Sequence, residues 1–350
     1  YITKEMALNI PTITACVDLI KNTIATLPIK LYKENGKEVI ELKDDTRVKL
    51  LNDDTKDTLD GFQFKSAIID DYLFHGNAYA YINKERGKVK SIHYVEESQV
   101  SINTNVDPIF KNYDIWVNGE RYKPYNFIKV LKNTKNGADG EGILDTSQKI
   151  LSVAYNYLEY ENILALTGGN KKGFITSEYK LDEEAKIKLK EQWKKLYSKN
   201  SDSCVVLNKG LNFKESGSTS TELQMNENKN TNSIEMCNIF NVPPQMLKGA
   251  SKADEDDKSK FINNCIIPIL EAITTALNRD LLLEKEKGSF YFAFDTKELL
   301  KGDIEKRYKA YEIAIKNKIL LPNEVRYEEN KEPIEAFNDT IVLGLNDVLY

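Results

Sequence analysis

The stretch IFNVPPQML, residues 239–247, separates two parts of the chain that differ in character. The residues before it, 219–240, are polar early and amphipathic late, a pattern that predicts a helix. The double proline ends this helix, because proline lacks a backbone N–H and disfavours helical geometry in the residue before it. The residues after it, 248–260, contain no large apolar side chain and mix lysines with acids. They predict a solvated loop.

A long apolar helix is expected after this loop, from about residue 260 to residue 284. Pro268 lies inside it. An internal proline removes a hydrogen bond and clashes with the preceding turn, so we expect a kink there. The apolar stretch 261–283 also carries Asn263, Glu271 and Arg279, which argues against a membrane span. The chain is expected to close with a strand at 290–294, a helix at 303–318 and a short helix from Pro322.

A small β-α-β-β unit is expected before residue 219. Residues 173–177 predict a strand, Asp182 caps an amphipathic helix, and 204–208 with 211–214 predict a hairpin. The lysines of that helix form either an ordinary solvated face or a docking patch for an acidic partner. The helix expected before this unit, at 145–168, is apolar on more than one face. Such a helix needs several neighbours.

The first 143 residues predict a mixture of helices and short strands, so the fold class is α+β. Glycines cluster in the stretch 133–142, but they do not form GxGxxG. A flexible connector is therefore favoured over a nucleotide site. The expected elements are helices at 11–26 and 61–75 and strands at 78–82, 89–95, 99–103, 110–117 and 126–131.

The composition excludes several classes of function. The chain has 350 residues and a formal net charge of -5, which argues against a protein that grips nucleic acid over its whole surface. Four scattered cysteines without a CxxC pair argue against a disulfide framework or a zinc site. GxSxG and GxxxxGK[ST] are absent, and the two histidines lack metal-ligand spacing. The acidic run 254–257 favours a solvated face over a cation site. No catalytic residue, cofactor or metal is expected.

Four signatures along the chain resemble the HK97-type portal family of tailed bacteriophages and prophages. The double-proline stretch departs from the family at Asn241, where glycine is common. The loop after it is more acidic than usual, and this leaves open how the loop meets DNA. In chain order, the signatures are residues 15–28 with Ala15-Cys16-Val17 and Leu27-Pro28, GNAYA at 76–80, IFNVPPQML at 239–247, and LLKGD at 299–303 followed by PNEVR at 322–326.

The resemblance implies a portal-protein fold made of named parts. A mixed α/β wing takes residues 1–143. Long stem helices take 144–168 and 219–245, on either side of a β-α-β-β clip at 169–218. A tunnel loop at 246–259 leads into a tunnel helix at 260–287, kinked at Pro268. Residues 288–350 add wing and C-terminal helices, with little or no crown.

The resemblance also implies a function and partners. The chain would form a ring of about twelve subunits at one capsid vertex, through which double-stranded DNA is packaged and ejected. Terminase large subunit and a head–tail adaptor would dock on the clip, and major capsid and scaffold proteins would surround the ring. The location would be the virion, and the host cytoplasm during assembly, with no membrane. The candidate site residues are Lys248, Lys252, Lys258 and Lys260 facing DNA, and Lys186, Lys190, Trp193 and Lys194 on the clip.

Two other functions stay open from the residues alone. One is another phage head–tail adaptor or structural protein, which particle size would distinguish. The other is a DNA-processing enzyme, which would need clustered carboxylates for metal ions, and the sequence offers no such cluster outside the run 254–257.

Overall fold

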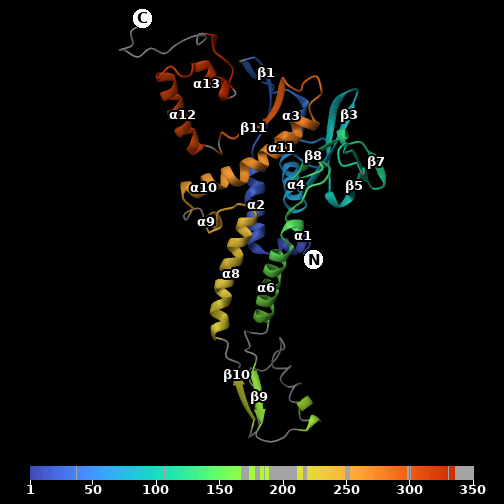
Figure 1. Ribbon diagram of the computed structural model, residues 1–350, viewed down its shortest axis with the longest axis vertical. Coiled ribbons are helices and arrows are strands. Elements are labelled where there is room, and N and C mark those ends of the chain that lie inside the picture. The colour runs from blue at the N-terminus through green and yellow to red at the C-terminus, as the bar shows by residue number, and fades with distance from the viewer. Residues whose placement is uncertain are drawn as a thin grey trace. The chain divides into compact units, whose positions relative to one another are not determined.

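The computed structural model describes residues 1–36, 38–105, 107–166, 173–177, 182–184, 186–188, 211–215, 219–248, 253–297, 299, 301–329 and 331–335 (Figure 1). These residues form two compact units. The first contains residues 1–14 and 147–239, and the second contains residues 15–146 and those described from 240 onward. The first unit is therefore largely an insertion in the sequence of the second.

Two long helices dominate the first unit. They are α6 (Gln148–Leu166) and α8 (Thr219–Ile239), which are joined by an ion pair between Lys229 Nζ and Glu161 Oε1 at 3.0 Å. The short helix α1 (Lys4–Leu8) contacts α6. Both long helices were predicted, although α6 begins three residues later than expected.

Residues of the expected β-α-β-β unit also belong to the first unit. Strands β9 (Gly173–Ser177) and β10 (Leu211–Glu215) pair antiparallel. Residues 183–184 and 186–188 are helical, as predicted. The expected strand at 204–208 lies outside the described residues.

The second unit contains three small antiparallel sheets. In the first, β1 (Ile29–Asn35) lies between β2 (Glu38–Glu41) and β11 (Phe290–Phe294). Ile29 stands opposite Phe294, so this sheet joins the two ends of the unit's sequence. Helix α2 (Pro11–Ala25) precedes it and carries the predicted apolar stripe, in which Ile13, Val17 and Ile20 are fully buried.

The second sheet has the order β4-β3-β8, with β3 at Asn77–Glu85, β4 at Lys88–Val95 and β8 at Phe127–Leu131. Arg86 and Gly87 have φ values of 51° and 77°, the left-handed geometry of a tight hairpin turn. Helix α4 (Gly61–Phe74) packs on β3. The third sheet consists of β5 (Val100–Thr104), β6 (Tyr113–Val117) and β7 (Glu120–Tyr122), and shares a core of Tyr79, Ile115 and Phe127 with the second.

The loop 133–142 is packed closely against the end of α4. A Cβ on Gly142 would lie 2.1 Å from the carbonyl oxygen of Phe74, and one on Gly140 would lie 2.3 Å from that of Lys132. Gly76, at φ +76°, faces the backbone of Glu141 and Gly142 in the same way. The expectation of a flexible connector is therefore wrong, because these glycines permit a close backbone contact.

The remaining elements are short helices and the C-terminal pair. Helix α3 was not predicted, and Asp45 caps it by accepting a hydrogen bond from the N–H of Arg47 at 2.9 Å. Near the C-terminus, Arg307 pairs with Glu329 at 2.7 Å, and Tyr327 donates a hydrogen bond to Glu34. The bounds are α3 (Thr46–Asn52), η1 (Glu97–Gln99), η2 (Pro124–Asn126), α5 (Ile143–Thr146), α12 (Lys301–Lys316) and α13 (Pro322–Glu328).

Candidate functional site

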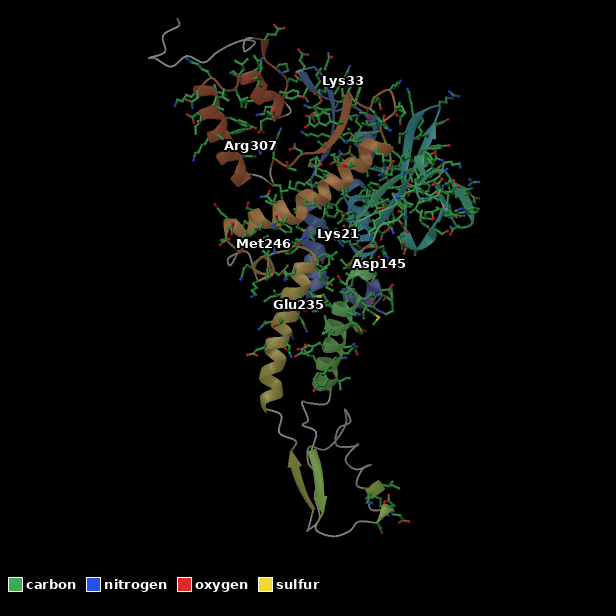
Figure 2. The ribbon with its side chains drawn as sticks, viewed as in Figure 1. Lys21, Lys33, Asp145, Glu235, Met246 and Arg307 are labelled. Carbon is green, nitrogen blue, oxygen red and sulfur yellow. The ribbon has the colours of Figure 1, made fainter. Side chains whose placement is uncertain are left out.

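The candidate site is the segment that follows the double proline. It contains α9 (Pro244–Leu247), α10 (Glu255–Phe261), the π-helical segment η3 (Ile262–Ile266) and α11 (Ile267–Asp280). Helices α9 and α10 are in contact, and Met246 of α9 is labelled in Figure 2. From α10 to α11 the backbone is helical without a break.

The entry to this segment depends on Asn241. Its φ of +53° is left-handed, a conformation that glycine and asparagine adopt more readily than other residues. Phe240 and Val242 on either side are buried, at 5% and 2% exposure. The chain therefore turns at Asn241 while both neighbours stay in the core, and this explains why asparagine can replace the glycine that is common in the family's motif.

The predicted loop 248–260 is partly helical, which corrects the expectation from its composition. Asp254 Oδ1 accepts a hydrogen bond from the N–H of Asp257 at 2.8 Å and caps α10. The acids lie in the first turn and Lys258 and Lys260 in the last. This order favours a helix, because carboxylates stabilise the positive N-terminus and ammonium groups the negative C-terminus. The same charges that suggested solvation therefore stabilise a helix.

The kink expected at Pro268 takes the form of the π-helical turn just before it. The N–H of Ile267 donates to the carbonyl of Ile262, five residues earlier. Proline at position 268 has no N–H for the carbonyl of Asn264 and would clash with it in an α-helix. The wider π turn accommodates the proline ring without ending the helix.

The C-terminal end of α11 is fixed to the second sheet by charged groups. Lys129 Nζ lies 3.1 Å from Asp280 Oδ1, and the two side chains are 4% and 5% exposed. Burial lowers the pKa of Lys129, whereas the neighbouring Asp280 carboxylate raises it. Arg279 donates to the carbonyl oxygen of Lys129 at 2.6 Å, and Asn278 accepts from the N–H of Phe292 at 2.7 Å.

The solvent-exposed positions of the segment are polar, with charges of both signs. Lys260 pairs with Asp256 at 2.5 Å, and this hydrogen bond raises the pKa of Lys260. Lys248 and Lys258 are also exposed. The uncharged exposed positions include Asn263, Asn264 and Thr275. The surface therefore offers hydrogen-bond donors without a strong excess of either charge.

The structure places only some of the candidate residues. Lys248, Lys258 and Lys260 belong to the segment from α9 to α10, whereas Lys252 lies outside the described residues. Among the clip candidates, only Lys186 is described, and it pairs with Glu183 at 2.6 Å. Lys190, Trp193 and Lys194 also lie outside the described residues, so their docking role stays a prediction.

A hydrogen-bonded chain of Ser91, His93 and Asp57 was not anticipated. Ser91 Oγ lies 2.8 Å from His93 Nε2, and His93 Nδ1 lies 3.1 Å from Asp57 Oδ1. Ser91 is only 6% exposed, and its Oγ already accepts from Asn83 at 3.0 Å, so a substrate has little room to approach. The chain instead fixes the loop around Asp57 to β4. Ser91 and His93, two apart on a predicted strand, share one face, but the sequence gives no sign of Asp57 opposite them.

Comparison with known proteins identifies the family. A family model described as phage portal protein matches residues 11–330, which includes the whole segment from α9 to α11. The chain belongs to the phage portal protein family. The resemblance and the α+β fold predicted from the sequence are thereby confirmed.

Portal relatives match most of the chain at low identity. The probable portal protein of Streptomyces phage phiC31 is 20% identical, covering 95% of this chain and 77% of the relative. The portal protein of Enterobacteria phage HK97 is 19% identical, covering 95% and 81%. Among solved structures, an HK97 family phage portal protein from Corynebacterium diphtheriae has a TM-score of 0.65 at 16% identity, covering 84% and 95%. A chain in the virion of a native gene transfer agent has a TM-score of 0.64 at 17% identity, covering 94% and 92%.

One helical run of this portal protein, Glu255–Asp280, is long and apolar enough to cross a membrane by length and composition alone. Core helices of soluble proteins pass the same test, and 44% of the apolar window is buried inside the protein. The ends of the run carry the Asp254 cap and the buried Asp280. The expectation that this stretch does not span a membrane stays a prediction.

Proposed function

We propose that this portal protein forms a ring of about twelve subunits at one capsid vertex and conducts double-stranded DNA during packaging and ejection. Its place is the virion, and the host cytoplasm during assembly. Its role is structural rather than enzymatic. Terminase large subunit and a head–tail adaptor are the partners proposed for the clip, and major capsid and scaffold proteins those proposed for the ring.

The observation that supports a ring is a second apolar face on α6. Ile150, Val153, Tyr160 and Ile163 are 39%, 58%, 43% and 54% exposed. Their spacing of three and seven residues places them on one side of the helix. Exposed apolar surface of this kind marks a protein contact. Because an interface between unlike faces of identical subunits closes into a ring, a neighbouring subunit is the partner that the proposal requires.

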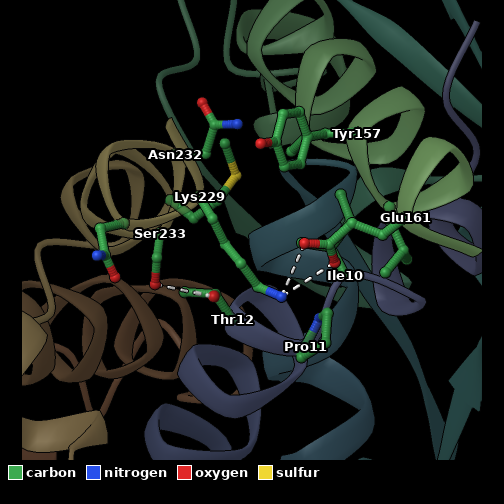
Figure 3. Close-up of a pocket in the computed structure, with 12 residues that line it drawn as sticks. Ile10, Pro11, Thr12, Tyr157, Glu161, Lys229, Asn232 and Ser233 are labelled. Carbon is green, nitrogen blue, oxygen red and sulfur yellow. Dashed lines mark hydrogen bonds and ion pairs between the residues drawn. The ribbon is translucent and has the colours of Figure 1, made fainter. Parts of the chain in front are cut away.

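The opposite side of α6 is already occupied within the subunit. It lines a pocket of about 220 Å³ with α8 and the start of α2 (Figure 3). The pair Lys229–Glu161 and the hydrogen bond between Thr12 and Ser233, at 3.1 Å, cross this pocket. The exposed face is thus additional to the contacts that hold α6 in its own subunit.

The charge balance of the candidate segment supports a conduit. Each contact of a lysine with phosphate adds favourable counterion release, and a ring multiplies every such contact about twelvefold. Acids that alternate with lysines on α10 limit this grip, and Lys260 is already paired with Asp256. The exposed Asn263 and Asn264 can donate to passing phosphates without adding charge.

Native mass spectrometry and electron micrographs of the purified chain test the ring. We expect particles of about twelve subunits with a central hole wide enough for a duplex. A compact dimer without a hole would support the alternative of a head–tail adaptor and exclude the conduit. For the channel itself, changing Lys252 and Lys258 to Glu should alter DNA packaging or retention in particles. Unchanged packaging and retention would count against contact of these lysines with DNA.

A further inference from the structure

The loop between β5 and β6 presents two large apolar side chains to solvent. Ile109 is 79% exposed and Phe110 is 78% exposed. The other large apolar residues of this sheet, such as Ile115 and Tyr113, pack into the shared core. Adjacent apolar side chains at the tip of a loop, outside any core, are typical of a contact with another protein. We call residues 107–112 the tip loop.

The tip loop is held in shape by its own polar side chains. Asp107 Oδ1 accepts hydrogen bonds from the N–H groups of Ile109 at 2.8 Å and Phe110 at 3.1 Å. Asn105 Nδ2 donates to the carbonyl of Phe110 at 2.7 Å, and Asn105 Oδ1 accepts from the N–H of Asn112 at 2.9 Å. A partner therefore meets a loop that is already ordered, and little conformational entropy is lost on binding.

A groove of about 190 Å³ lies beside the tip loop. One wall comes from the tip loop, with Pro108 and Lys111, and the other from the neighbouring loop, with Asn136 and Ala138. The groove therefore combines an apolar edge with amide and ammonium donors. Such donors suit a peptide segment that carries carboxylates.

The charges around the groove favour an acidic partner. The carboxylates of Asp107 and Asp139 accept hydrogen bonds from their own loops, with Asn136 Nδ2 donating to Asp139. Lys111 Nζ lies 3.2 Å from the carbonyl oxygen of Lys135, a neutral acceptor that leaves its charge uncompensated. The ammonium group of Lys111 therefore faces the groove without a neighbouring acid among its hydrogen-bond partners.

We propose that the tip loop and its groove are a docking site for a segment of the major capsid protein in which apolar residues are flanked by Asp or Glu. Ile109 and Phe110 enter an apolar recess of that protein, and Lys111 pairs with a flanking carboxylate. This inference rests on the proposed function, which places the ring within a capsid shell. It adds to that function the surface that holds the ring there.

Incorporation of the chain into capsid shells tests the docking site. The full chain is co-expressed with the major capsid and scaffold proteins of the same phage, and the copies of the chain per shell are measured by quantitative mass spectrometry. Changing Ile109 and Phe110 to Ser should lower incorporation at least tenfold, and Lys111→Glu should lower it by a smaller factor. The matched control is Tyr125→Ser, because Tyr125 is an exposed aromatic residue, at 66%, that does not line the groove. It should leave incorporation unchanged.

Separate measurements distinguish this inference from the ring. Native mass spectrometry should give the same ring for the Ile109/Phe110 variant as for the wild type. Loss of the ring in that variant alone would make the tip loop a contact between subunits and overturn the inference. So would unchanged incorporation, or binding of the wild type to phosphatidylglycerol vesicles that the variant loses. A wild-type chain that forms no ring under any condition would instead count against the proposed function.

Discussion

Lys129 and Asp280 form an ion pair in the interior of the second unit, with 3.1 Å between Nζ and Oδ1. It joins β8 to the last turn of α11 and so fixes one end of the helical run that begins at α10. Beyond that end the run has no proline until Pro268, where the π turn begins to the N-terminal side. The anchored part of the candidate site is therefore α11.

Removing Lys129 should destabilise the protein. Lys129→Met leaves the Asp280 carboxylate buried with fewer partners, so we expect a loss of about 3 kcal/mol in the free energy of unfolding. Denaturant unfolding followed by circular dichroism measures this loss. Lys123→Met is the matched control, because Lys123 is 48% exposed and pairs with Asp114 at the surface. It should cost less than about 1 kcal/mol, and equal losses in the two variants would contradict the argument.

A charge on the exposed face of α6 should prevent assembly. Val153→Glu places a carboxylate in the middle of this face, where burial against a neighbour would be costly. We expect the fraction of chain in rings, measured by native mass spectrometry, to fall at least tenfold while circular dichroism stays unchanged. Asn162→Glu adds the same charge on another side of α6 and should assemble normally. Rings that form equally well from both variants would exclude this face as the interface.

The buried Lys65 should make stability depend on pH in the alkaline range. Burial lowers the pKa of Lys65 from 10.5 to about 8, and its Nζ donates to the carbonyl of Leu27 at 2.8 Å. The folded protein therefore releases this proton at lower pH than the unfolded chain. The unfolding free energy should rise as the pH increases from about 8 to about 10, relative to a Lys65→Met variant. A difference between the two proteins that stays constant from pH 7 to pH 10 would show that the amine is not desolvated.

The close contact at Gly142 should tolerate no side chain. Gly142→Ala would bring a Cβ within 2.1 Å of the carbonyl oxygen of Phe74, so the backbone must move, and we expect a loss of about 3 kcal/mol. Gly87→Ala is the comparison, because it meets open space and only its left-handed φ is unfavourable. That variant should lose about 1 kcal/mol. Thermal unfolding of both variants gives the order, and a reversed order would refute the steric explanation.

Local signals in the sequence predicted many of the elements. The stripe in α2, the turn at Arg86-Gly87 and the double proline after α8 depend on residues close together in the chain, and each element lies where expected. Helix α10 was missed because a short polar helix has no apolar period to reveal it. Its stability comes instead from the order of charges and the Asp254 cap.

Contacts between distant residues could not be predicted from these patterns. No local rule links Lys129 to Asp280 or Asp57 to His93, because each pair forms only once the strands and helices are in place. The glycines at 76, 140 and 142 were visible as a cluster, but glycine permits both flexible and closely packed backbone. Only the position of Phe74 distinguishes the two. The candidate segment was located by its motif, whereas its anchors and its π turn required the structure.

The pairing of β1 with β11 also bears on how the protein is synthesised. Ile29 waits for Phe294, so the first sheet stays incomplete until nearly all of the second unit has left the ribosome. The first unit, whose long helices are local in sequence, emerges in between and can fold earlier. During that interval the open edge of β1 is exposed to other nascent chains. Premature termination after residue 239 should therefore yield an aggregation-prone fragment rather than a folded half.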